Sequence, residues 1–128
     1  MIPISRFNFF GEEAVHEEPG LVRWRYVVKP EHFNPQGSLH GGVISTLLDT
    51  CMGHSVRTVR PPDHGHAAIY LHVDFLRPTL QPGVTLTFEG RVVQKGKRVV
   101  FTEGTASDEA GQPLARSSSS YALIPKKT

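Results

Sequence analysis

One stretch of this sequence, from about His40 to Val59, repeats its apolar residues at intervals of three and four. The residues that follow this spacing are Val43, Ile44, Leu47, Leu48, Cys51 and Met52. On an α-helix they form one apolar stripe, which must be buried against another layer. Two prolines, Pro61 and Pro62, follow the stretch, where proline disfavours further helix. The sequence therefore predicts one long helix that buries one side.

The rest of the chain favours β-strands, because apolar and polar residues alternate along it. Leu21 to Val28 has this period of two before the helix, and the chain from Ala67 to Pro78 has it afterwards. Three more strands are expected at 84–94, 98–107 and 114–124, joined by short turns. Strands joined in this way pair antiparallel. The predicted fold class is α+β, an antiparallel sheet with the helix on one face, in a single domain spanning 1–128.

The composition excludes several classes of protein. Hydrophobic residues make up 38% of the chain and charged residues 20%, as in soluble globular proteins, and no apolar run approaches the ~20 residues of a membrane-spanning helix. The formal net charge of +2 is too small to indicate a nucleic-acid partner. The segment from Met1 to Gly20 lacks the apolar region of a secretory signal, which predicts a cytoplasmic location. The single cysteine, Cys51, leaves no disulfide framework.

A dense motif surrounds the start of the expected helix. It runs Asn34-Pro35-Gln36-Gly37-Ser38-Leu39-His40-Gly41-Gly42 and continues with Leu47-Leu48-Asp49. This pattern resembles the N-x-x-G-x-x-H-G-G-x(6)-D signature of hotdog-fold thioesterases, and it is most similar to the PaaI-like and thioesterase-superfamily-member-2 group. The segment 72–78 also resembles the strand that follows the helix in that family. The resemblance implies a hotdog fold, in which an antiparallel sheet wraps around one long central helix.

The same resemblance implies an acyl-CoA thioesterase without a cofactor, which acts on aromatic or medium-chain acyl-CoA. It implies that Asp49 is the nucleophile or the general base and that the Gly41 amide polarises the thioester carbonyl. Asn34 and His40 would shape the pocket around the same atoms. The alternatives are that Asn34 only makes a turn with Pro35, and that His40 caps the helix or packs against it.

Thioester hydrolysis builds negative charge on the carbonyl oxygen, so a catalyst needs donors aimed at that oxygen before the reaction begins. Free amides at a helix N-terminus supply them, and glycine lets the acyl group approach the backbone. Asp49 comes eight residues after Gly41, about 12 Å along a helix, so the two cannot serve one carbonyl within one chain. We therefore expect a homo-oligomer, a dimer or a homotetrameric dimer of dimers, in which Gly41 and Asp49 of different subunits form each site.

The expected substrate contacts form two groups. The apolar group surrounds the acyl chain and comprises Phe33, Gly42, Leu48, Met52 and Val56. The basic group offers charge to the phosphates of coenzyme A and comprises Arg77, Arg91, Lys95, Lys97 and Arg98. An ordinary solvated turn is the alternative explanation of the basic hairpin.

Some family members hold the hydrolytic water with a serine or threonine on the strand after the helix, where Ala67 and Ala68 stand here. The candidates to replace that hydroxyl are Thr46, Thr50, His64 and His66. The last two histidines lack a third ligand at a set spacing, so no metal site is expected. Cys51 and His54 imitate a nucleophile and its base, yet Cys51 lies on the apolar stripe, where an inert buried thiol is expected.

Two other functions remain open. A hotdog dehydratase or hydratase also places a helix carboxylate near a histidine, and His32-Phe33 resembles part of the His-Phe-Pro motif of those enzymes. A non-catalytic acyl-CoA-binding protein is the third possibility, because a hydroxyl is missing at positions 67 and 68. Release of free thiol, loss of water, or binding alone separates the three.

Overall fold

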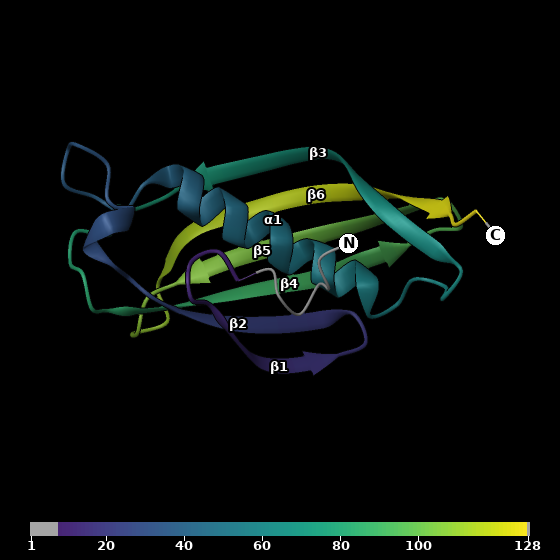
Figure 1. Cartoon of the computed structure of the whole chain (residues 1–128), viewed down its shortest axis with the longest axis horizontal. Helices are drawn as coiled ribbons and strands as arrows, with labels where there is room; N and C mark the ends of the chain where they lie inside the picture. Colours follow the sequence, from purple (N-terminus) through teal and green to yellow (C-terminus); the bar gives the residue numbers. More distant parts are fainter. Residues whose placement is uncertain (1–7, 128) are drawn as a thin grey trace.

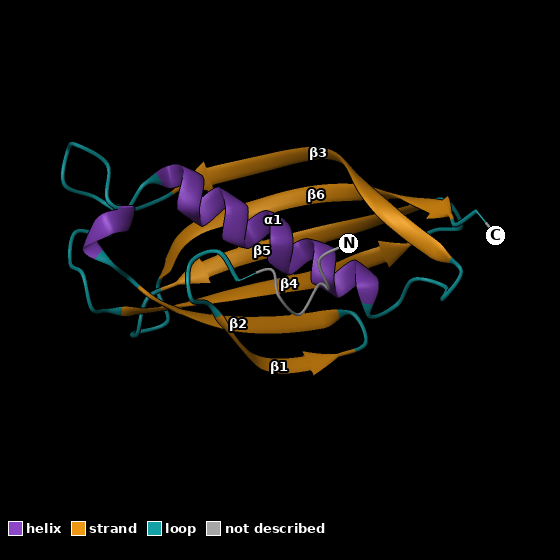
Figure 2. Cartoon of the chain, viewed as in Figure 1, coloured by secondary structure: helices purple, strands orange, loops and turns teal. Residues whose placement is uncertain are grey.

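The computed structural model describes residues 8–127 and contains one antiparallel sheet with a helix across one of its faces (Figures 1 and 2). The elements in chain order are β1 (Glu13–Glu18), β2 (Leu21–Val27), one 3-10 turn (Pro30–His32), α1 (Gly41–Arg57), β3 (His64–Phe75), β4 (Thr85–Lys95), β5 (Val99–Ser107) and β6 (Pro113–Pro125). The strand order is β1-β2-β4-β5-β6-β3. The expected α+β class is confirmed. Within residues 8–127 no helix has both the length and the apolar content to cross a lipid bilayer.

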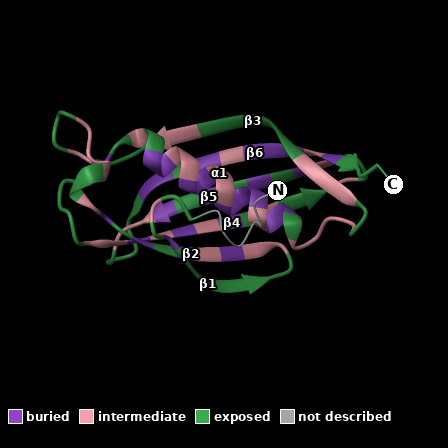
Figure 3. Cartoon of the chain, viewed as in Figure 1, coloured by how far each residue is buried: buried purple, intermediate pink, exposed green. Residues whose placement is uncertain are grey.

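The predicted apolar stripe holds α1 on the sheet. Leu48 and Met52 on the helix and Tyr26 and Phe88 on the facing strands are all fully buried, and in Figure 3 the buried positions lie on α1 and on the central strands. Alternation along each strand explains this layer, because every second side chain of β4 and β5 faces the helix. Burial of each such side chain contributes about 1.5–3 kcal/mol.

Two strand glycines bring the helix unusually close to the sheet. A side-chain carbon at Gly90 on β4 would collide with the backbone of Cys51. A side-chain carbon at Gly104 on β5 would press on Met52 and on the hydroxyl of Ser117. The middle of α1 therefore packs against bare backbone, which fixes the height of Asp49 above the sheet.

The structure differs from the sequence expectations at two strands. The strand β1 was not expected, because all its side chains are exposed; backbone pairing with β2 and the ion pair of Glu13 with Arg25 hold it. The strand β3 begins at His64 rather than at Ala67, since His64 and His66 pair with Pro125 and Leu123 of β6. These two histidines therefore lie in a strand and not in a polar loop. The expectation about the start of the chain falls partly on residues 1–7, outside the described range.

The two edges of the sheet have opposite characters. At one edge, β1 is short and carries Glu13, Glu17 and Glu18, which discourage pairing with another chain. At the other edge, β3 is twelve residues long and exposes apolar side chains. These side chains are Ile69 (56% exposed), Tyr70 (46%), Leu71 (41%) and Phe75 (55%).

Candidate active site

At the start of α1, a single backbone amide has no acceptor within the described part of the chain. His40 is the N-cap, and its Nδ1 accepts a hydrogen bond of 2.7 Å from the Gly42 amide. The Val43 amide donates to the carbonyl of His40 at 3.0 Å. Among residues 8–127 the Gly41 amide has no acceptor. The positive end of the helix dipole therefore presents the N–H of Gly41, rather than that of Gly42, to an incoming oxygen.

Gly41 and Gly42 each leave space that a side chain would fill, and the neighbour differs between the two. A side-chain carbon at Gly41 would lie 3.1 Å from Cζ of Phe75, so the ring of Phe75 lies directly against this residue. A side-chain carbon at Gly42 would lie 2.9 Å from Nδ1 of His40 and would disrupt the cap. The capping role that was one alternative for His40 is thus confirmed. In its neutral form, His40 then carries its proton on Nε2, where it can donate away from the helix.

The carboxylate of Asp49 is held by a tyrosine of the last strand. The hydroxyl of Tyr121 lies 2.9 Å from Oδ1 and 2.9 Å from the backbone oxygen of Asp49. Tyr121 itself is only 3% exposed, so its ring is fixed by packing. Burial, followed by the negative charge of Asp49, raises the pKa of Tyr121 above its usual range, and the phenol therefore stays a donor.

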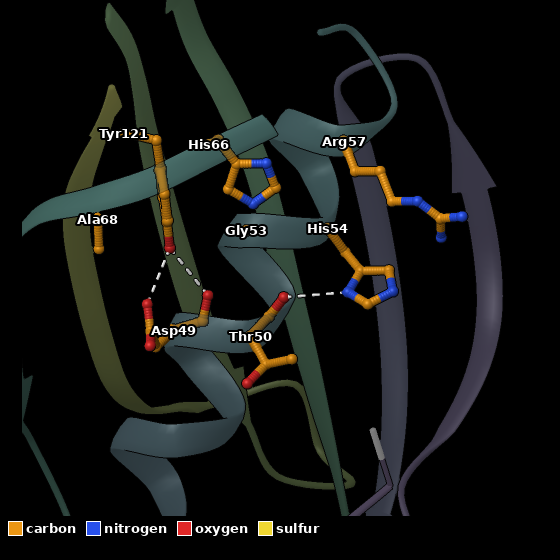
Figure 4. Close-up of a pocket in the computed structure, with 8 residues that line it drawn as sticks. All are labelled: Asp49, Thr50, Gly53, His54, Arg57, His66, Ala68 and Tyr121. Atoms are coloured by element: carbon orange, nitrogen blue, oxygen red, sulfur yellow. Dashed lines mark hydrogen bonds between the residues drawn. The ribbon is translucent and has the colours of Figure 1, made fainter. Parts of the chain in front are cut away.

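Asp49 lies at the wall of a small cavity between α1 and β3, which Figure 4 shows in close-up. The cavity has a volume of about 260 Å³. Its lining residues are Asp49, Thr50, Gly53, His54, Arg57, His66, Ala68 and Tyr121. This volume lies below the ~300–1,000 Å³ of usual ligand pockets. One chain alone therefore provides a small recess rather than a full-sized pocket for an acyl-CoA thioester.

Both histidines of the cavity are held in the neutral form. Burial lowers the pKa of His66 to about 4, and the positive charges of Arg60 and Arg57 act in the same direction. Burial likewise lowers the pKa of His54. The cavity at neutral pH thus combines one carboxylate and one guanidinium with two uncharged imidazoles.

Asn34 organises the loop that precedes the helix. Its Nδ2 donates to Oγ of Ser38 at 2.9 Å, and its Oδ1 accepts from the backbone amide of Ser38 at 3.1 Å. The backbone amide of Asn34 also donates to the carbonyl of Ser38 at 2.8 Å. This loop leads directly to His40, so Asn34 supports the helix start. Its contact with a substrate stays a prediction.

The residues expected to contact the acyl group lie mostly in the core. Leu48, Met52 and Val56 are 0% exposed, and Sδ of Met52 accepts a hydrogen bond of 3.5 Å from Ser117. Phe33 is half-buried and packs against the edge of this core. Neither Phe33 nor Met52 lines the Asp49 cavity, so their contact with a substrate stays a prediction.

The basic residues expected at coenzyme A lie apart from the Asp49 cavity. Arg77 donates to Asp108 at 3.2 Å and lines a separate recess of about 330 Å³. Arg91 pairs with Glu89 at 3.4 Å. Lys95, the last residue of β4, and Lys97 and Arg98 of the turn that follows are exposed. Their turn lies beside the end of β6, where the amide of Leu123 donates to the carbonyl of Arg98.

The remaining candidates are resolved by their partners. Cys51 is fully buried, and burial raises the pKa of its thiol above the usual range, so it is the inert residue that was expected. The hydroxyl of Thr46 donates to the backbone oxygen of Gly42, and that of Thr50 donates to the backbone oxygen of Thr46. His64 pairs with Asp63 at 2.8 Å. In the described part of the chain no three metal-ligating side chains lie close enough to share an ion.

Sequence reasoning missed Tyr121 and Arg57. The alternation of β6 places residues 117, 119, 121 and 123 on the helix side, and this pattern indicates that Tyr121 faces α1. Arg57 lies eight residues after Asp49, and helical spacing puts both on one side with Gly53 between them. Strand alternation and helical spacing show which side of an element a residue lies on. They do not show which residue of another element it contacts.

Comparison with known proteins relates this chain to one family. The family model of the thioesterase superfamily matches residues 36–115, which include the start of α1 and Asp49. A provisionally named esterase of Saccharolobus solfataricus is 33% identical over 102 residues, which cover 80% of this chain and 66% of that protein. Human acyl-coenzyme A thioesterase 13 is 26% identical over 96 residues, which cover 75% of this chain and 67% of the human protein.

Two solved structures share the fold. A Streptococcus mutans protein, solved bound to acetyl-CoA, matches with a TM-score of 0.84 at 23% identity and covers 94% of each chain. The E. coli PaaI protein, from the phenylacetic acid degradation operon, matches with a TM-score of 0.84 at 22% identity over 92% of this chain and 83% of its own. The hotdog arrangement expected from the sequence is thereby confirmed.

Proposed function

The chain belongs to the thioesterase superfamily, and from this premise we propose that it hydrolyses aromatic or medium-chain acyl-CoA thioesters to coenzyme A and the free acid. The observation that carries the proposal is the amide of Gly41 at the N-terminus of α1, which has no acceptor among residues 8–127. That amide is a preorganised donor for the oxyanion of an acyl-transfer reaction. The name of human acyl-coenzyme A thioesterase 13 and the acetyl-CoA in the S. mutans structure support the substrate class.

The site is formed between two copies of the chain. Gly41 and Asp49 lie about 12 Å apart along α1, too far to act on the same carbonyl. Each group therefore works with the complementary group of a second subunit. The small volume of the Asp49 cavity supports this arrangement, because the cavity needs a further wall to enclose an acyl thioester.

The exposed edge of β3 supports a specific way to build that dimer. A long apolar edge strand is a template for pairing with an identical strand of a second copy. A two-fold axis near Ile69, in the middle of β3, sets Phe75 of one copy beside the His64–His66 end of the other. Since Phe75 lies against Gly41, and His66 lines the Asp49 cavity, this pairing brings Gly41 of the partner subunit towards Asp49.

In the proposed reaction the thioester carbonyl oxygen accepts a hydrogen bond from the Gly41 amide of one subunit. Asp49 of the other subunit acts as the nucleophile, or as the general base that takes a proton from water. Tyr121 keeps the carboxylate in place through its hydrogen bond. Asn34 and His40 orient the loop and the helix start that carry the amide.

Charge at one end of the molecule suits the phosphates of coenzyme A. Arg57 lines the Asp49 cavity near the C-terminal end of α1. Lys95, Lys97 and Arg98 lie where β4 ends and turns into β5. Figure 1 shows that α1 and β4 run towards the same end of the molecule, so these residues and Arg57 lie at that end. Guanidinium and ammonium groups there offer charge-assisted hydrogen bonds to phosphate.

Activity with a panel of aryl- and alkyl-CoA esters tests the proposal through the release of free thiol, detected with a thiol-reactive dye. The variant Asp49→Asn should remain a folded oligomer and lose about a hundred- to ten-thousandfold in kcat. Glu18→Gln is the matched control, because Glu18 pairs with His16 on β1, at the opposite edge of the sheet from β3. Full turnover by Asp49→Asn would contradict the proposal. Binding without thiol release, or water loss from hydroxyacyl thioesters, would identify one of the other two functions instead.

A further inference from the structure

The imidazole of His66 is fixed between two neighbours at the Asp49 cavity. On one side, a nitrogen of the Arg60 guanidinium lies 2.5 Å from Nδ1 of His66. On the other side, the imidazole ring meets the ring of Tyr121 edge-on, with ring centres 5.4 Å apart and an interplanar angle of 86°. The ring therefore has one orientation, which Figure 4 shows beside Gly53 and Tyr121.

The contact with Arg60 also fixes the tautomer of His66. A guanidinium has only donors, so Arg60 donates and Nδ1 of His66 accepts. A neutral imidazole whose Nδ1 accepts must carry its proton on Nε2. Because burial and nearby positive charge keep the pKa of His66 at about 4, the ring is neutral at ordinary pH. His66 therefore offers one donor, Nε2–H.

This donor faces a space that is bounded by Tyr121 and Asp49. A side-chain carbon built on Gly53 would lie 3.5 Å from Nε2 of His66 and 3.7 Å from the hydroxyl oxygen of Tyr121. The bare face of Gly53 thus leaves room between the two polar atoms. The same hydroxyl lies 2.9 Å from Oδ1 of Asp49, so an imidazole donor, a phenol oxygen and a carboxylate surround one place.

The neighbouring side chains do not offer an equivalent donor. The hydroxyl proton of Thr50 is used by the backbone oxygen of Thr46. His54 has its Nδ1 3.3 Å from the backbone oxygen of Thr50, which makes Nδ1 its protonated nitrogen and leaves Nε2 as an acceptor. Ala68 contributes only a methyl group to the cavity wall. Of the two imidazoles that line the cavity, His66 is thus the one whose donor is fixed on Nε2, the atom beside Gly53.

We propose that His66 holds the water molecule that attacks the thioester, with Nε2–H donating to the oxygen of the water while Asp49 accepts one of its protons. This inference rests on the proposed thioesterase function. The water oxygen forms a bond to the carbonyl carbon as its proton passes to Asp49. The tetrahedral intermediate then collapses, the carbon–sulfur bond breaks, and the departing thiolate takes the proton from Asp49. The products are the free acid and the thiol of coenzyme A.

Two substitutions of His66 distinguish the effect of its Nε2–H donor from the effect of its ring packing. His66→Phe keeps a flat ring against Tyr121 and removes the donor, and it should lower kcat about ten- to hundredfold with little change in KM. His66→Gln restores a neutral amide donor and should recover much of that loss. His16→Phe is the control, because His16 is exposed on β1 at the far edge of the sheet. A folded His66→Phe oligomer with kcat within twofold of wild type would overturn the role of His66.

A measurement on the unmodified protein covers the case in which His66→Phe does not fold. In the protein labelled with ¹⁵N-histidine, two-bond ¹⁵N–¹H spectra at neutral pH should show His66 with its proton on Nε2 and a bare Nδ1. A proton on Nδ1, or a charged ring at pH 6, would overturn the inference while leaving the thioesterase function intact. Absence of thiol release from every acyl-CoA ester by the wild-type protein would overturn both.

Discussion

The hydroxyl of Tyr121 lies 2.9 Å from Oδ1 of Asp49, so the last strand of the sheet fixes a carboxylate in the middle of the helix. Tyr121→Phe removes this donor and leaves the ring in place. We expect a loss of about 1 kcal/mol in the free energy of unfolding and a loss of about tenfold in kcat, because the carboxylate is no longer held in one rotamer. Urea denaturation and thiol-release kinetics measure the two effects. An unchanged kcat would show that Asp49 is positioned by something else.

The Gly41 amide can be deleted by a residue that suits the first position of a helix. Gly41→Pro removes the N–H at the first helical position, where proline is well tolerated, and the extended backbone of His40 (φ −62°, ψ 130°) suits a following proline. We expect kcat to fall about a hundred- to thousandfold. Both substitutions add a side-chain carbon that presses on Phe75, but Gly41→Ala keeps the N–H, so it should lose less. Equal activity of Gly41→Pro and wild type would contradict the role of the Gly41 amide as the oxyanion donor.

His40 caps the helix through Nδ1 and, in its neutral form, carries an outward N–H on Nε2. Substitution by serine tests the two roles separately. His40→Ala should lower the free energy of unfolding by about 1 kcal/mol because the Gly42 amide loses its acceptor. His40→Ser restores the cap but not the outward Nε2–H. If His40 contacts the substrate, His40→Ser should regain stability in thermal unfolding while kcat/KM stays low. Full recovery of both quantities would limit His40 to capping.

The elements that could be predicted from the sequence are those whose apolar residues recur with a regular period. The helix was expected over His40–Val59 and lies at Gly41–Arg57, because its apolar stripe and the prolines beyond it are strong local signals. The strand β1 gave no such signal, since its side chains are all exposed. The partners of Asp49 and His66 were beyond prediction, because they depend on the pairing of β3 with β6 and on the height of the helix above Gly90.

The neutral state of His66 predicts how stability changes with pH. The unfolded chain takes up a proton at His66 near its ordinary pKa of 6.5, whereas the folded chain does so only near a pKa of about 4. The free energy of unfolding should therefore fall as the pH drops from 6.5 towards 4. The groups that face this ring are Arg60, Arg57, His54, Tyr121 and Asp49. His54 shifts in the same direction, so the contribution of His66 is the difference between wild type and His66→Gln. If the free energy of unfolding changed equally with pH in wild type and in His66→Gln, the lowered pKa of His66 would be contradicted.

The exposed edge of β3 should hold the subunits together. Ile69→Lys places a charge on the edge, and a two-fold axis brings the same charge in from both copies. We expect sedimentation velocity to show monomers and thiol release to disappear with them. Val15→Lys on β1 is the matched control, because Val15 is 47% exposed at the opposite edge. An active monomer of Ile69→Lys would contradict a site shared between subunits.

Mixing two inactive variants tests the shared site most directly. Asp49→Asn and Gly41→Pro are unfolded together in equal amounts, refolded, and assayed for thiol release. Random association makes half of the dimers mixed, and each mixed dimer contains one site with both Asp49 and Gly41 intact, so activity should return to about one quarter of the wild-type value. If each site belonged to one chain, both variants would stay inactive in every dimer, and the mixture would release no more thiol than the separate variants.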